Sequence, residues 1–134
     1  DIIFFHYEVE EDLNEIKNKI INSGSKPGIV LHAVNDYSKK LKEIASDFKD
    51  IMVLSIEKIG FSGQKFYEGS YKLIDQINNL DNRKQFNLHI DGGVNKQNIK
   101  SIKAQYIVSG SAVLNNENPR NAIMVLKTFG KYFR

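Results

Sequence analysis

Three short glycine-bearing segments hold the residues of this sequence that are best suited to chemistry. One is Asp91-Gly92-Gly93, the second is Ser109-Gly110-Ser111, and the third is residues 59–66, IGFSGQKF. Glycines let backbone N–H groups approach a ligand closely, and free N–H groups hold anions. Each segment alone is at least as compatible with an ordinary turn. Together they suggest a phosphate site with the carboxylate of Asp91 beside it.

These segments must be positioned by the apolar runs around them. The hydrophobic pattern predicts that these runs are buried strands. The runs are residues 2–6, 28–32, 51–56, 86–90 and 106–110. Apolar residues at helical spacing follow each run and predict a helix after every strand. The predicted stripes are Val9, Leu13, Ile16 and Ile20; Tyr37, Leu41, Ile44, Ala45 and Phe48; Leu73, Ile74, Ile77 and Leu80; Ile99 and Ile102; and Ala122, Ile123, Leu126 and Phe129, with Asn118 as N-cap and Pro119 in the first turn.

Strands that alternate with amphipathic helices predict a parallel sheet covered by helices. Two closures compete, an open doubly wound sheet and a (β/α)₈ barrel, and both place chemistry at the carboxyl ends of the strands. Glycine turns on two consecutive strands, with a short helix after the second, match the phosphate site of the seventh and eighth strands of a barrel. In the first turn we expect the amides of Gly92 and Gly93 to lie where a helix begins.

Composition narrows the class of protein. The 134 residues are 41% hydrophobic, which fits one domain with one core. The 19 basic and 16 acidic residues are spread along the chain without a basic block, so a nucleic-acid partner is not expected. The absence of cysteine excludes disulfides, thiolate metal sites and cysteine nucleophiles, and is compatible with a cytoplasmic protein. No apolar stretch approaches the roughly 18 residues that span a bilayer, so no membrane partner is expected.

A family resemblance rests on five segments. FFHYEVEEDLNEI, GIVLH, IGFSGQKF, HIDGGV and VSGSAV, in this order and spacing, resemble the second half of the ribulose-phosphate 3-epimerase family and its allulose-6-phosphate 3-epimerase relatives. The resemblance implies a (β/α)₈ TIM barrel, of which residues 1–134 supply strands four to eight and their helices. The N-terminal portion is absent from the sequence. Since the chain opens at Asp1 directly in an apolar run, we expect further sequence upstream.

The same resemblance implies an activity and roles for residues. The activity is metal-assisted epimerisation at carbon 3 of D-ribulose 5-phosphate to D-xylulose 5-phosphate, in the pentose phosphate pathway. Asp91 is implied as one of two acid-base aspartates and as a ligand of one divalent ion (zinc, iron, manganese or cobalt). The other aspartate and two histidine ligands belong to earlier strands, so the chain alone is expected to be inactive. The phosphate is expected on Gly92, Gly93, Gly110 and Ser111, and the loop that closes over the sugar is expected to be Gly60, Phe61, Ser62 and Gly63.

Alternatives remain open. Residues 55–59 replace a Met-Ser-Val-x-Pro segment of the relatives, which bears on the sugar more than on the phosphate, so another ketose phosphate such as allulose 6-phosphate is possible. A non-catalytic phosphosugar-binding or assembly module is the second class, and a homo-oligomer is expected. A decarboxylase or aldolase-like synthase, with Lys58 as its key group, is a weaker third. His6 and His32 are expected to face the core or the substrate, and His89 to fill an interior layer.

Overall fold

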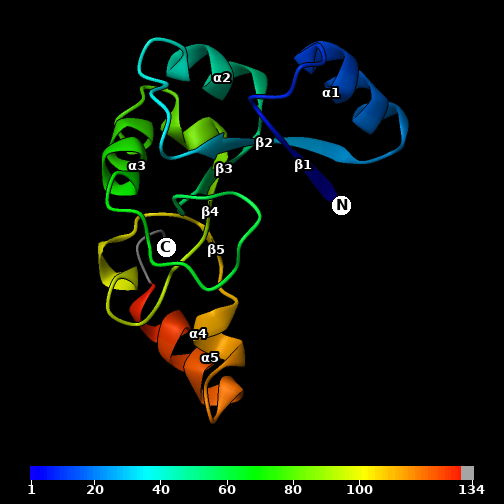
Figure 1. The fold of residues 1–134 in the computed structure, drawn as a ribbon. Helices are drawn as coiled ribbons and strands as arrows, with labels where there is room; N and C mark the ends of the chain where they lie inside the picture. The colour runs from blue at the N-terminus through cyan, green and yellow to red at the C-terminus, as the bar shows by residue number, and fades with distance from the viewer. Residues whose placement is uncertain (131–134) are drawn as a thin grey trace.

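The computed structural model describes residues 1–130, which form one parallel sheet with helices on its outer side (Figure 1). All strands run in chain order and each pairs in parallel with the next. The five predicted strands are therefore confirmed, and the sheet curves into an arc instead of the crossed order of a doubly wound fold. The strands are β1 (Ile2–His6), β2 (Lys26–His32), β3 (Asp50–Leu54), β4 (Asn87–Asp91) and β5 (Tyr106–Val108).

The helices lie where the apolar stripes predict them, although several are shorter than the stripes. Tyr37 and Phe48 lie outside the second helix, yet both are buried against the core, 4% and 5% exposed. Val9 and Leu80 also lie outside their helices. The helical elements are α1 (Leu13–Asn22), α2 (Leu41–Asp47), α3 (Ser70–Asn78), α4 (Ser111–Leu114) and α5 (Pro119–Phe129), with 3₁₀ turns η1 (Arg83–Gln85) and η2 (Ile99–Ser101).

Local capping chemistry sets two of these helix starts. The Asp12 side chain accepts hydrogen bonds from the backbone N–H groups of Asn14 and Glu15 at the start of α1. The Asn118 side chain accepts from Asn121 N–H at 3.0 Å, and Pro119 opens α5, which confirms the predicted cap. A cap satisfies N–H groups that the first turn of a helix leaves without partners.

The core lies between the sheet and the helices and follows the two-residue period of the strands. Alternate residues of the three central strands are completely inaccessible and pack against α2 and α3: Ile29, Leu31, Ile51, Val53, Leu88 and Ile90. The residues between them point to the opposite side, which we call the inner face. This division places the polar residues of the central strands, including His32, His89 and Asp91, on the inner face.

His89 occupies the middle of the inner face as an interior layer residue. Its Nε2 lies 2.9 Å from Asp50 Oδ1, and both side chains are buried. The Tyr106 ring stacks on the imidazole at a centroid distance of 4.6 Å, and the Phe4 ring meets it edge-on at 5.0 Å. These contacts join β1, β3, β4 and β5 across the inner face.

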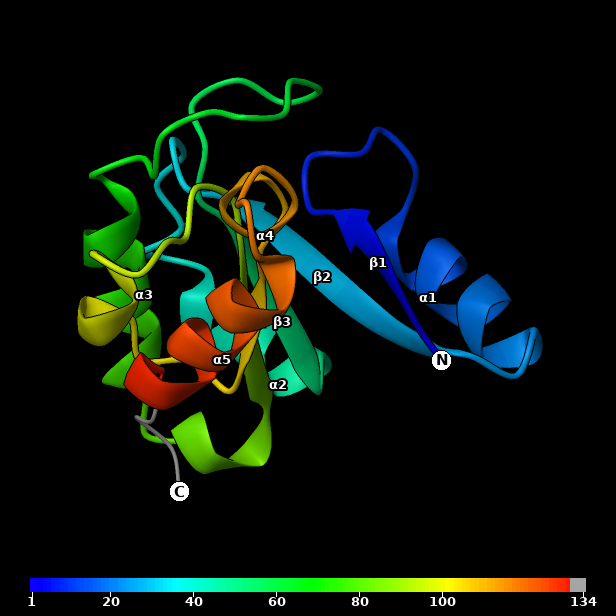
Figure 2. The same cartoon turned by 90° about the horizontal axis from the view of Figure 1, so that it is seen from below.

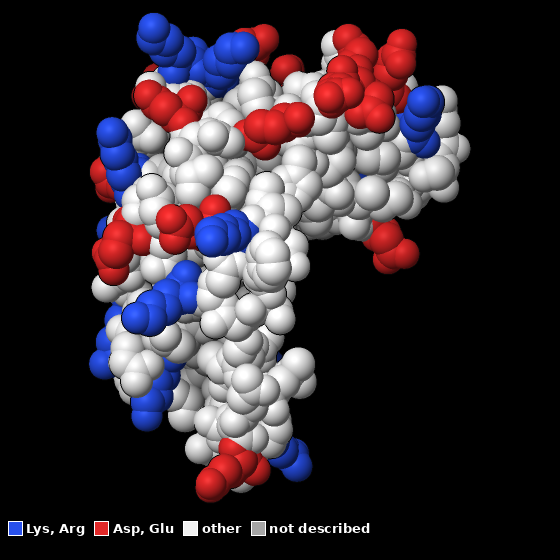
Figure 3. Space-filling view, in the orientation of Figure 1, with Lys and Arg blue, Asp and Glu red and all other residues white. Residues whose placement is uncertain are grey.

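Exposed apolar side chains gather at the two ends of the arc. Ile2, Ile3 and Ile21 are exposed at the β1 end. At the β5 end the prediction of a buried α5 stripe is wrong in part, because Ile123 and Phe129 are 43% and 41% exposed while Ala122 is buried. Further exposed apolar residues at this end are Tyr106, Val108, Leu114 and Met124. Figure 3 shows charged side chains over the outer helices and a mostly uncharged surface along the inner side of the arc.

Within residues 1–130, none of the helices combines the length and the apolar character needed to cross a bilayer. The described helices are instead short and have polar residues on one side, as helices that cover a sheet do. The longest of them, α5, has 11 residues.

Candidate functional site

The three glycine-bearing segments meet at one cavity of about 710 Å³ at the carboxyl ends of β3, β4 and β5. Figure 2 shows the long loop after β3, drawn in green, at the end of the sheet toward which β1 points. Parallel strands bring their carboxyl ends to one edge, so segments far apart in sequence become neighbours. All nine residues predicted for the site line this cavity: Gly60, Phe61, Ser62, Gly63, Asp91, Gly92, Gly93, Gly110 and Ser111.

Asp91 is the last residue of β4, opposite Leu54 of β3 and Val108 of β5 in the sheet register. Its side chain is half-buried on the inner face, and burial raises the pKa of its carboxyl above the usual value of 3.8. Desolvation disfavours the charged form of a carboxyl. A carboxylate with a raised pKa is a stronger proton acceptor than an exposed one, which is what proton abstraction next to a carbonyl requires.

Gly92 and Gly93 adopt backbone conformations that other residues rarely take, with φ of +120° and +68°. A Cβ at Gly92 would lie 2.5 Å from the Ile56 side chain, and one at Gly93 would collide with the backbone N of Phe66. The turn after Asp91 is therefore packed directly against the loop after β3. Only glycine satisfies both the φ and the close approach.

The expectation of a helix beginning at this turn is wrong. The next helical element is the 3₁₀ turn η2, and the chain between is held by amide side chains. Asn98 Nδ2 donates to Gly93 O at 2.9 Å, and Asn98 Oδ1 accepts from Asn95 N–H at 2.9 Å. The N–H groups available to an anion therefore belong to a braced turn, and no helix macrodipole adds to them.

The second turn does lead into a helix, as predicted. Gly110 precedes the four-residue α4, which begins at Ser111. The Ser111 hydroxyl lies 3.9 Å from the position that a Cβ on Gly63 would occupy, so the loop after β3 reaches the second turn as well. The cavity is thus lined by three glycine-bearing backbone segments.

Ser55 is a supporting residue that the sequence did not single out. It is fully buried, and its hydroxyl lies 2.9 Å from Asp91 O and 2.7 Å from Gly92 O. Its backbone N–H also donates to Asp91 O at 2.8 Å. A polar residue directly after an apolar strand, beside the Asp-Gly-Gly turn, was the available signal.

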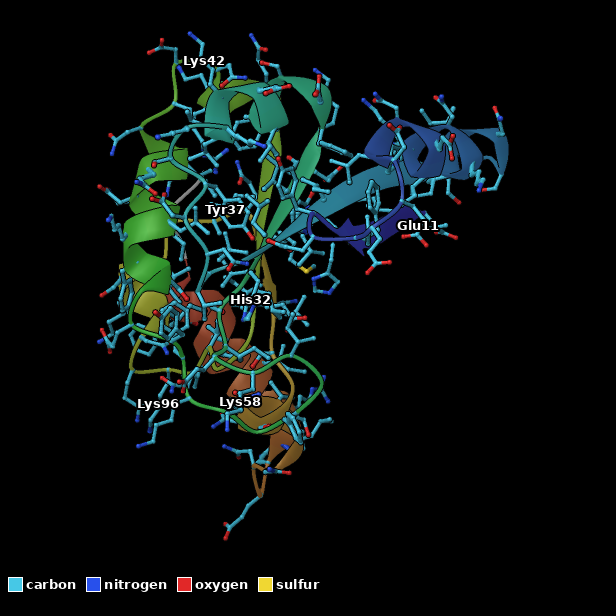
Figure 4. All side chains as sticks on the ribbon, turned by 45° about the horizontal axis from the view of Figure 1, so that its top comes forward. Glu11, His32, Tyr37, Lys42, Lys58 and Lys96 are labelled. Carbon is cyan, nitrogen blue, oxygen red and sulfur yellow. The ribbon has the colours of Figure 1, made fainter. Side chains whose placement is uncertain are left out.

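His32 and Tyr37 support the neighbouring rim (Figure 4). His32 is buried, with Nε2 2.8 Å from Ile56 O, and its backbone N–H donates to the Tyr37 hydroxyl at 2.9 Å. The Tyr37 hydroxyl in turn donates to the Glu8 carboxylate, and burial raises the pKa of Tyr37. His32 therefore ties the loop after β3 to β2 from the inner face of the sheet.

Within residues 1–130, neither Lys58 nor a complete set of metal ligands is found at the cavity. Lys58 lies on the loop beyond β3, which ends at Leu54 (Figure 4). It is not among the residues that line the cavity. Across residues 1–130, no three or more His, Asp or Glu side chains are grouped as a metal centre requires. The described residues alone therefore do not fit a metal, although the Asp91 carboxylate is suitable as one oxygen ligand.

The fold and the cavity define a chain of the (β/α)₈ barrel class with a glycine-lined site at the strand ends. Solved structures confirm the fold. A 3-hexulose-6-phosphate synthase from Salmonella typhimurium superposes with a TM-score of 0.72 over 97% of this chain and 61% of its own, at 14% identity. A second 3-hexulose-6-phosphate synthase gives a TM-score of 0.65 over 96% of this chain and 61% of its own, at 16% identity.

Sequence comparison identifies the family. The model of the ribulose-phosphate 3 epimerase family matches residues 1–114, and the chain belongs to this family. A ribulose-phosphate 3-epimerase of Serratia marcescens is 30% identical over 88% of this chain. The chloroplastic ribulose-5-phosphate-3-epimerase of Arabidopsis thaliana is 30% identical over 95%, and the Bacillus subtilis ribulose-phosphate 3-epimerase is 28% identical over 95%. The chain spans only 58%, 47% and 60% of these relatives, respectively.

Proposed function

We propose that this chain is the carboxy-terminal part of a ribulose-phosphate 3-epimerase, which interconverts D-ribulose 5-phosphate and D-xylulose 5-phosphate. One observation carries the proposal. The half-buried carboxylate of Asp91 lines the same cavity as two neighbouring glycine turns, Gly92-Gly93 and Gly110-Ser111. A proton acceptor beside an anion cradle is the minimum that epimerisation of a sugar phosphate requires.

In this proposal the turns bind and Asp91 moves a proton. The backbone N–H groups of Gly92, Gly93, Gly110 and Ser111 hold the phosphate, which orients the sugar with carbon 3 toward Asp91. Asp91 takes or returns the carbon 3 proton on one face of the enediolate. Inversion needs a second acid-base group on the other face. Asp91 is the only acidic residue among those that line the cavity in residues 1–130, so the second group comes from elsewhere.

We also propose a divalent metal ion, zinc, iron, manganese or cobalt, with Asp91 as one ligand. When bound, such an ion stabilises negative charge on the enediolate oxygens. Since residues 1–130 supply no group of three ligands, the remaining ligands would come from other strands. The roles given above to the turns and to Asp91 do not depend on the ion.

The exposed apolar residues at the ends of the arc support a proposal for where these groups come from. Both edge strands have exposed apolar neighbours, while the central strands are buried on the helix side. A (β/α)₈ barrel has eight strands and this sheet has five, so three further strand–helix units would close it. We propose that β1–β5 are strands four to eight and that the added units cover the exposed apolar residues. We further propose that the completed barrel is a cytoplasmic homo-oligomer.

A second candidate function is a non-catalytic module that binds or assembles around phosphosugars. The observation in its favour is that Asp91 has no acidic partner among the described residues of the cavity. In this case the glycine turns still bind phosphate, and another copy of the chain covers the sheet edges. Another ketose phosphate, such as allulose 6-phosphate, would fit the first candidate equally well, because backbone amides that hold a phosphate do not select the sugar attached to it.

Isotope exchange separates these possibilities. The full-length protein, supplied with zinc, iron, manganese or cobalt, should incorporate solvent deuterium at carbon 3 of D-ribulose 5-phosphate. Asp91→Asn should abolish the exchange and leave the affinity for the sugar phosphate within about threefold, because the cradle consists of backbone amides. Exchange with allulose 6-phosphate alone would reassign the substrate. Binding of ketose phosphates without any exchange would support the module and overturn the epimerase.

A further inference from the structure

The Gln64 side chain makes three hydrogen bonds within the tip of the loop after β3. Gln64 Oε1 accepts a hydrogen bond from Lys58 N–H at 3.0 Å, and Gln64 Nε2 donates to Lys58 O at 2.6 Å. The second hydrogen of the amide donates to Phe61 O at 2.7 Å. The Gln64 amide therefore pairs with both backbone groups of Lys58, as a neighbouring strand would, and also fixes Phe61.

The backbone angles and exposure of the loop show why hydrogen bonds are needed to order it. Gly60 and Gly63 have φ of +91° and +74°, and a Cβ on Gly60 would meet nothing within 4 Å. Phe61 at the tip is 67% exposed, so no packing against the core holds it. A segment with two glycines and little burial has high conformational freedom unless hydrogen bonds restrict it.

We propose that Gln64 is a positioning residue, which fixes the loop over the phosphate cradle before any ligand binds. A sugar phosphate would then bind under the loop with little ordering cost, and Phe61 would cover the ligand from the rim. Gln64 itself would not touch the reacting atoms. The consequence for catalysis rests on the proposed function, whereas the consequence for the loop does not.

Trypsin tests the loop without ligand or activity. Trypsin cleaves after lysine. The carbonyl of the Lys58–Ile59 bond is the one that accepts a hydrogen bond from Gln64 Nε2. A bond must leave its hydrogen-bonded structure to be cut, so cleavage reports local opening. In the full-length protein we expect slow cleavage after Lys58 and at least about tenfold faster cleavage in Gln64→Ala. Gln64→Glu should behave similarly, since it keeps the acceptor and loses both donors.

Two controls make this result specific. Gln85→Ala removes an exposed glutamine from η1, at the opposite end of β4, and should leave cleavage after Lys58 unchanged. Cleavage after Lys72, inside α3, reports global unfolding and should be unchanged in every variant. Equal cleavage after Lys58 in wild type and Gln64→Ala would overturn the proposal. So would equal acceleration after Lys58 and Lys72, which would make Gln64 a support of the whole fold.

Kinetics then test the link to function. Gln64→Ala should raise KM for the ketose phosphate about tenfold and change kcat less than about threefold. The reason is that an ordered loop stabilises the bound substrate and the transition state equally, so its loss weakens binding without slowing the chemical step. Faster cleavage with unchanged KM and kcat would overturn the positioning role. Gln64 would then order the loop without affecting substrate binding. Absence of activity in the wild type would contradict the proposed function, and the trypsin result would still stand.

Discussion

The Ser55 hydroxyl lies 2.9 Å from the carbonyl oxygen of Asp91, and the Ser55 backbone N–H donates to the same oxygen at 2.8 Å. The residue that follows β3 therefore supports the backbone of the residue that ends β4. Because the hydroxyl also lies 2.7 Å from Gly92 O, the support extends into the turn that lines the cavity. The position of the Asp91 carboxylate thus depends on a neighbour 36 residues earlier in the chain.

Ser55→Ala should lower the free energy of unfolding by about 1–3 kcal/mol, because Gly92 O then loses the hydroxyl donor and Asp91 O keeps only the backbone N–H of residue 55. Urea denaturation measures the change. Ser46→Ala is the matched control, since this exposed serine donates to Lys42 O at 2.9 Å on the surface of α2. Its loss should cost less than about 0.5 kcal/mol. Equal effects of the two substitutions would contradict the support role of Ser55.

Gly93→Ala should destabilise the protein by more than about 2 kcal/mol and abolish phosphate binding. The φ of +68° disfavours alanine, and the added Cβ would collide with the Phe66 backbone, which cannot move independently of the loop. Gly110→Ala is the control for the fold, because a Cβ there meets nothing within 4 Å. Thermal unfolding should show a large loss for Gly93→Ala only. A stable Gly93→Ala protein would show that the turn is not packed as described.

Asp91→Asn should stabilise the metal-free protein at neutral pH. Burial raises the pKa of the Asp91 carboxyl, so the folded protein binds this proton more tightly than the unfolded chain. Stability then falls as pH rises from the usual aspartate pKa of 3.8 through the folded-state pKa, and the cost remains at pH 7. Asparagine has no such cost. Melting temperatures from pH 3.5 to 7 should separate with rising pH, and parallel curves would contradict a buried carboxylate.

Asp50→Ala should lower the free energy of unfolding by about 3 kcal/mol, since it leaves His89 without its buried partner. Asp50 Oδ1 also accepts from Asn87 Nδ2 at 3.1 Å, so two donors lose one acceptor. Asp81→Ala, at an exposed aspartate before η1, should change the free energy by less than about 0.5 kcal/mol. Both substitutions lie away from the cavity, so KM should stay unchanged while only stability responds. A loss of substrate affinity in Asp50→Ala would contradict this separation.

The sequence alone predicted the five strands, the order of the helices and the segments that line the cavity. Strands have a two-residue period and helices a period of about 3.6, so burial leaves a readable pattern in both. The pattern located helix ends less well where tertiary packing buries residues outside a helix, as with Tyr37 and Phe48. It also predicted a helix after Asp91, because two glycines after a strand are common to helix starts and to braced turns.

The tertiary structure decided how these segments meet. Ser55 reaches Asp91 and His89 reaches Asp50 across 36 and 39 residues, and neither pairing has a local signature. Gln64 lies within a recognised motif, yet only the folded loop shows that its amide closes on Lys58. A one-dimensional pattern records which side of an element is buried. Which side chains complete each other's hydrogen bonds depends on strand register and loop path, which exist only once the sheet has formed.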